Sequence, residues 1–109
     1  MMKLCSDVLH ALKGKTLATA ESCTGGMIGA ALTAVPGASK VYKGGIISYW
    51  SDVKETILGV DPEDLKTLGP VSAQVAGSMA DGARKALQTD YAISVTGLAG
   101  PPATSSASR

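Results

Sequence analysis

Residues 16–26 read TLATAESCTGG, and this stretch predicts the architecture around it. Residues 16–20 have the nearly continuous small and apolar character of a buried strand. A break follows over residues 22–26, which end in two glycines, and residues 27–35 continue as an apolar helix. A buried strand that passes through a glycine-containing corner into a helix is typical of a layered α/β sheet.

The alternation of helix and strand continues on both sides of this stretch. Pro36-Gly37 and Gly69-Pro70 separate segments, while Asp61 and Ser72 are typical first residues of helices. The expected helices cover residues 4–13, 27–35, 52–58, 61–68 and 73–88, and the expected strands cover residues 16–20, 41–49 and 91–96. This order predicts an α/β fold of three layers, α/β/α, around a mostly parallel or mixed sheet.

Two of these helices carry apolar stripes that predict which side packs inward. At residues 4–13 the stripe consists of Leu4, Val8, Leu9 and Leu12. At residues 73–88 it consists of Val75, Met79, Ala83 and Leu87. We expect both stripes to contribute to the core.

Length and composition limit the classes of protein to be considered. The 109 residues suffice for one domain, and a formal net charge of +1 gives no basic excess for a nucleic-acid partner. The apolar runs are shorter than the roughly 18 residues of a membrane span. Two cysteines and one histidine predict neither a disulfide framework nor a metal site. We therefore expect a cytoplasmic protein with no metal, cofactor or membrane partner.

The corner at residues 21–26 is the first candidate for chemistry. Ser22, Thr24 and the amides of Gly25 and Gly26 precede a helix, where an oxyanion or a phosphate could bind. The alternative is an ordinary helix cap by Ser or Thr. Ser22 and Cys23 both remain possible nucleophiles, because adjacent strand residues point to opposite faces.

Two further segments follow strands in the same way. Tyr49 closes the second strand, and Lys54 lies about one turn into the next helix. A lysine acts as a base only where burial or a neighbouring cation lowers its pKa from about 10.4; otherwise it is a solvated side chain. Thr96 and Gly97 follow the third strand. If the strands are parallel, all three segments meet at the edge where α/β sheets bind ligands.

Residues 16–101 resemble the CinA C-terminal domain family, the nicotinamide-nucleotide amidases. The matching stretches are AESCTGG at 20–26, LTAVPG at 32–37, GGIISY at 44–49, Lys54 with LGV at 58–60, GPVS at 69–72, MADGAR at 79–84 and TGLAGP at 96–101. The resemblance implies hydrolysis of nicotinamide mononucleotide to nicotinic acid mononucleotide and ammonia. It implies Ser22 as nucleophile, Lys54 and Tyr49 as base and support, and Thr96 in the same site.

The sequence departs from the family pattern at two places. Asp52 replaces an asparagine, and an inward-pointing carboxylate would raise the pKa of Lys54. Residues 102–109 match nothing in the family, so we expect an incomplete domain at 1–101 and a disordered tail at 102–109. The alternative function is an impaired remnant that folds as an oligomer and binds nucleotide or phosphate. In either case we expect a homo-oligomer that covers apolar surface near residues 91–96 or 73–88.

Overall fold

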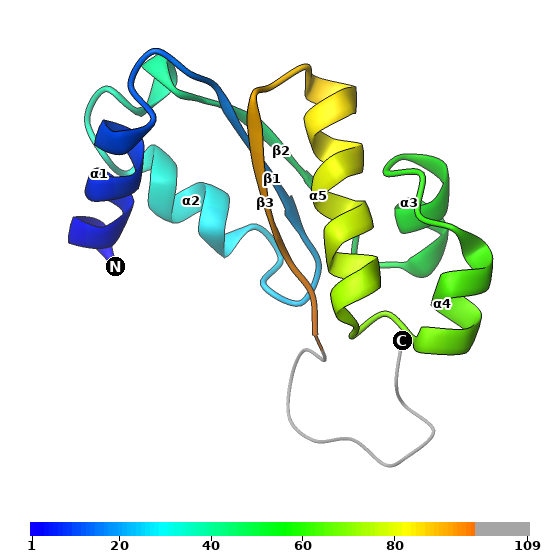
Figure 1. Ribbon diagram of the computed structural model, residues 1–109. Coiled ribbons are helices and arrows are strands. Elements are labelled where there is room, and N and C mark those ends of the chain that lie inside the picture. Colours follow the sequence, from blue (N-terminus) through cyan, green and yellow to red (C-terminus); the bar gives the residue numbers. More distant parts are fainter. Residues whose placement is uncertain (98–109) are drawn as a thin grey trace.

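The protein is described by a computed structural model in which residues 1–97 are placed (Figure 1). The elements are α1 (Met2–Ala11), β1 (Leu17–Glu21), α2 (Met27–Thr33), the 3₁₀ helix η1 (Ala38–Lys40), β2 (Tyr42–Ile47), α3 (Ser51–Thr56), α4 (Pro62–Leu68), α5 (Ala73–Leu87) and β3 (Tyr91–Val95). Their order confirms the predicted one, and η1 is an addition to it. The predicted domain end at residue 101 and the predicted tail at 102–109 lie outside the described residues.

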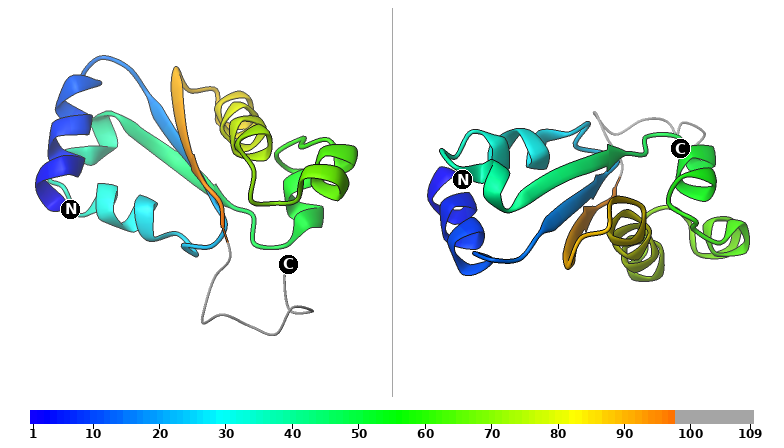
Figure 2. Two further views of the ribbon diagram at one scale, coloured as in Figure 1. Left: turned by 60° about the horizontal axis from the view of Figure 1, so that its bottom comes forward. Right: turned by 90° about the horizontal axis from the view of Figure 1, so that it is seen from above.

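The sheet is parallel throughout, with strand order β2-β1-β3. Helices α1 and α2 lie on one side of it, and α5 lies on the other with α3 and α4 beyond it (Figures 1 and 2). The predicted three-layer α/β/α architecture is therefore confirmed. Because all three strands run the same way, their carboxyl ends share one edge of the sheet.

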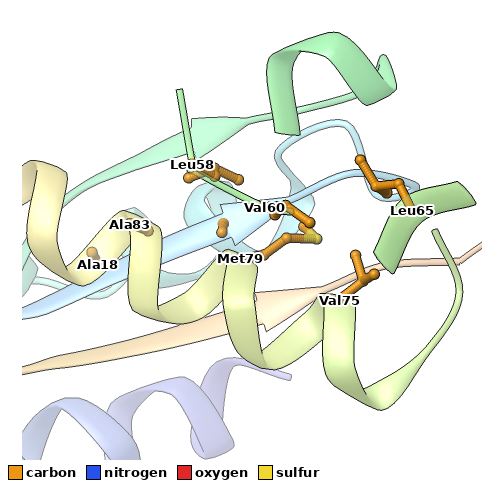
Figure 3. Packing of buried hydrophobic residues seen from close by; sticks show 8 residues of the cluster. Ala18, Leu58, Val60, Leu65, Val75, Met79 and Ala83 are labelled. Atoms are coloured by element: carbon orange, nitrogen blue, oxygen red, sulfur yellow. The ribbon is translucent and has the colours of Figure 1, made fainter. Parts of the chain in front are cut away.

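The core under α5 is built from its predicted stripe (Figure 3). Val75, Met79 and Ala83 are fully buried against Ala18 and Ala20 of β1. Complete burial of a side chain such as Val or Met contributes about 1.5–3 kcal/mol. This packing holds α5 across the middle of the sheet.

A glycine on α5 sets how closely this helix approaches the segment after α3. A Cβ atom added at Gly82 would overlap the main-chain carbonyl of Leu58. Gly77, five residues earlier on the same helix, has no atom within 4 Å of such a Cβ. The contact at Gly82 therefore requires the absence of a side chain, whereas Gly77 faces open space.

The predicted inward stripe of α1 is wrong at one position. Leu4 is 63% exposed, and Cys5 is buried beside Leu9 instead. These two side chains pack with Leu32 of α2 and Leu17 of β1 in a second core cluster. Helix α1 is rotated about its axis so that Cys5 and not Leu4 faces inward. This rotation is set by the contact with α2 and not by the periodicity of α1.

The two layers of helices leave part of β3 uncovered. Every residue of β1 is buried, whereas Tyr91 and Ile93 of β3 are 50% and 38% exposed. Their register partners on β1 are Leu17, which packs with α1 and α2, and Thr19, whose hydroxyl bonds to Tyr42 beside the same cluster. The apolar face of the edge strand β3 is consequently open on this side of the sheet.

Candidate active site

Ser22 follows directly on the central strand and is held in place by its main chain. Its N–H donates to the carbonyl of Val95 at 3.1 Å, and its carbonyl accepts from the N–H of Gly25 at 3.1 Å. Gly25 and Gly26 have φ values of 64° and 108°, a region that strongly favours glycine. The turn that presents Ser22 therefore depends on these two glycines.

Lys54 extends from α3 to Ser22 through the interior of the protein. Its side chain is 1% exposed, and Nζ donates to Ser22 Oγ at 3.0 Å. The same nitrogen donates to the carbonyl oxygens of Ser48 at 2.7 Å and Tyr49 at 3.5 Å. The structure thus brings Ser22 and Lys54 together, and it answers the question of parity: Ser22 and not Cys23 has this contact with the lysine.

The first turn of α3 aims Lys54 inward. The N–H groups of Val53 and Lys54 both donate to the carbonyl of Trp50, and Val60 N donates back to the carbonyl of Lys54. Asp52, two residues before the lysine, is exposed. The effect on Lys54 considered above required an inward-pointing Asp52 carboxylate, and the exposed position of Asp52 does not meet that requirement.

The start of α2 is capped by Glu21, so the alternative of an ordinary cap by Ser or Thr is wrong. The N-cap residue is Gly26 and has no side-chain cap. Instead, the buried Glu21 carboxylate accepts from Ile28 N at 2.7 Å, from Gly29 N at 2.8 Å and from the Thr24 hydroxyl at 2.7 Å. These three donors are occupied by the Glu21 carboxylate, so an anionic group of a substrate at this corner must bind to other donors.

The sequence pattern did not single out Ser48, which connects the end of β1 to Lys54 through hydrogen bonds. It is completely buried, and its N–H donates to the carbonyl of Glu21 at 2.7 Å. Its own carbonyl accepts from Lys54 Nζ. A serine at the end of a strand is an ordinary residue, and only its pairing with the end of β1 reveals this role.

The third predicted segment lies at the same edge. The Thr96 hydroxyl donates to the carbonyl of Pro70 at 2.7 Å, which ties the end of β3 to the loop before α5. A Cβ added at Gly97 would be 3.4 Å from Cys23 Sγ. Tyr49 is half-exposed, and its carbonyl is one of the acceptors of Lys54. All three strand ends therefore meet around Ser22.

A buried amine beside a serine hydroxyl can perform nucleophilic chemistry without histidine. In the neutral form of Lys54, its two N–H groups can donate to the Ser48 and Tyr49 carbonyls. With its lone pair directed at Ser22 Oγ, 3.0 Å from Nζ, the neutral amine can accept the proton of that hydroxyl. Within residues 1–97, no group of three or more His, Cys, Asp and Glu side chains could hold a metal ion, and no helix is long and apolar enough to cross a membrane.

Comparison with known proteins gives consistent matches. A family model described as the CinA C-terminal domain matches residues 1–108, a longer range than the resemblance at 16–101 and one that includes positions 102–108. A CinA-like protein of Synechococcus sp. (strain CC9311) is 58% identical over 101 residues, which are 90% of this chain and 24% of that protein. One from Parasynechococcus marenigrum (strain WH8102) is 54% identical over 100 residues with the same coverage. The chain thus spans about a quarter of the length of these curated relatives.

Solved structures give the same result. The competence damage-inducible protein A of Klebsiella pneumoniae has a TM-score of 0.90 and 34% identity, covering 98% of this chain and 68% of that one. The competence/damage inducible protein of Agrobacterium tumefaciens has a TM-score of 0.86 and 41% identity, covering 95% and 64%.

Proposed function

The chain belongs to the CinA C-terminal domain family, and we propose that it is an amidohydrolase in which Ser22 is the nucleophile and Lys54 the general base. The observation that carries this proposal is the 3.0 Å contact between Lys54 Nζ and Ser22 Oγ inside the protein. A hydroxyl alone is a weak nucleophile and needs an adjacent base. The buried amine supplies that base.

The reaction follows from these two groups. Ser22 Oγ attacks the carbon of a substrate carboxamide while Lys54 Nζ takes the hydroxyl proton. Lys54 then returns this proton to the departing nitrogen, so that ammonia leaves and an ester to Ser22 remains. Lys54 Nζ then takes a proton from water, which attacks the ester, and returns that proton to the leaving Ser22 Oγ, so that the carboxylic acid is released and Ser22 is regenerated. Nitrogen and protons balance over the cycle without an external oxidant or metal.

We propose the carboxamide of nicotinamide mononucleotide as the substrate, on the strength of the family resemblance. The phosphate of such a substrate needs a cation or several amide donors. Within residues 1–97 the sole arginine is Arg84, whose main chain bonds to Thr89 just before β3 begins. It lies toward the amino ends of the strands, away from Ser22. The contribution of the phosphate to substrate affinity is therefore measured by comparing KM for the mononucleotide and for its riboside.

The experiment is ammonia release from nicotinamide mononucleotide, with its dephosphorylated riboside as a second substrate. Ser22→Ala is expected to lose at least about a thousandfold in rate. Cys23→Ala is the matched control and should cost less than about tenfold, since its thiol is not the group beside Lys54. The reverse ranking would point to a thiol enzyme.

A nucleotide-binding protein without turnover is the second candidate, since the same strand-end edge around Ser22 is where α/β sheets bind ligands. Calorimetric binding of the mononucleotide together with an undetectable rate would support this candidate over the amidase. Turnover that Ser22→Ala abolishes would exclude it.

A further inference from the structure

Beyond the serine and lysine themselves, we propose that Glu21 is a positioning residue that holds both of them in register. This inference rests on the proposed function, because it assigns Glu21 a part in making Ser22 reactive. Glu21 occupies the last position of the central strand, directly before the nucleophile. Its side chain and its main chain each support one member of the pair.

The side chain secures the turn that carries Ser22. The carboxylate is 2% exposed and accepts from the Thr24 hydroxyl and from the amides of Ile28 and Gly29. A buried carboxylate is costly unless donors compensate its charge. The ion pairs found within residues 1–97 lie on the surface and do not include Glu21. Amides and a hydroxyl therefore do the compensation, and they fix the residues that follow Ser22.

The main chain of Glu21 secures the lysine. Its carbonyl accepts from Ser48 N at 2.7 Å and from Ser48 Oγ at 3.4 Å. The carbonyl of Ser48 in turn accepts from Lys54 Nζ at 2.7 Å. Lys54 Nζ donates to Ser22 Oγ, and Ser22 is bonded to Glu21, so the path closes into a ring.

Replacing the carboxylate tests the side-chain half of this ring. In Glu21→Gln the volume is kept, but an NH2 group faces donors where an acceptor oxygen is needed. The turn after Ser22 should shift, which separates Ser22 Oγ from Lys54 Nζ. A misplacement of about 1 Å can lower a rate by about a hundredfold.

The readout is covalent labelling of Ser22 by an alkyl fluorophosphonate, which does not depend on the natural substrate. Ser22 Oγ bonds to phosphorus, fluoride leaves and Lys54 takes the proton. Asp90→Asn is the matched control, since the Asp90 carboxylate also accepts from an amide and a threonine hydroxyl, those of Thr16, before β1 begins. Labelling rate, kcat, KM and the urea midpoint are measured for each variant.

We expect Glu21→Gln to slow labelling and kcat by at least about tenfold and to leave KM within about twofold. Asp90→Asn should lower the urea midpoint without slowing the labelling. If Glu21→Gln fails to fold, Thr24→Val decides, because it removes a single donor and should slow labelling by a smaller factor.

Three results separate the possible failures. Labelling of Glu21→Gln within about twofold of wild type, or equal slowing in Asp90→Asn, overturns the role of Glu21. Labelled wild type that releases no ammonia overturns the proposed substrate alone. Wild type that is not labelled overturns both, since Ser22 is then not an activated nucleophile.

Discussion

Replacing Gly82 with alanine tests how closely α5 is set against the segment that leads out of α3. At an exposed helix position the change from glycine to alanine stabilises a protein by about 1 kcal/mol. At Gly82 the new methyl group would overlap the Leu58 carbonyl, a main-chain group that cannot rotate away. Overpacking costs about 1–3 kcal/mol, and we take the upper value because the obstacle is backbone. The net expectation is a loss of about 2 kcal/mol.

Gly77→Ala on the same helix is the control, because its methyl group meets no atom. It should gain about 1 kcal/mol, so the two variants should differ by about 3 kcal/mol. At about 4–8 °C per kcal/mol this is a difference in Tm of roughly 12 °C or more. Far-UV circular dichroism should be used, since Trp50 is 70% exposed and reports burial poorly. Equal stability of the two alanine variants would refute the close contact at Leu58.

Three further outcomes follow from residues described above. Lys54→Arg should lower the amidase rate by at least about a hundredfold, because a guanidinium stays protonated; a variant that keeps a tenth of the rate would contradict the role of base. Hydrogen bonds from the Thr16 amide and then its hydroxyl hold the pKa of Asp90 below its usual 3.8, so its stabilisation is present above that value and is lost as the pH falls further. Urea midpoints at pH 7 and pH 3 should accordingly differ less in Asp90→Asn than in wild type. Sedimentation velocity should show association that Ile93→Lys weakens, and monomeric wild type at tens of micromolar would contradict it.

Local chemistry made much of the fold predictable. Asp61 accepts from the amide of Glu63, and Ser72 accepts from that of Val75. The first residues of α4 and α5 could therefore be predicted from one capping side chain each. The apolar stripe of α5 predicted its buried face, because Val75, Met79 and Ala83 recur every four residues and lie on one side of the helix. The same reasoning failed at Leu4, because the helical period of α1 is compatible with either Leu4 or Cys5 on the buried side. The packing against α2 buries Cys5.

The candidate site was predictable in its location but not in its connections. Parallel strands bring the ends of β1, β2 and β3 to one edge, which is why Ser22, Lys54 and Thr96 could be grouped from the sequence. The choice of Ser22 over Cys23 depends on the twist and register of β1. The capping of α2 by Glu21 joins residues that are seven and eight positions apart, beyond the spacing of known capping motifs.

The placement of β1 between its two neighbours has a consequence for how the chain folds during synthesis. Thr19 and Tyr42, which are bonded across β1 and β2, are 23 residues apart, whereas Thr16 and Asp90 at the other side of β1 are 74 apart. A ribosome at about 5–20 residues per second therefore releases β2 seconds before β3. During this interval β1, the strand that ends directly before Ser22, has a bare edge. Slow translation of the segment between β2 and β3 would prolong it, and this edge would then be exposed to chaperones that bind extended strands.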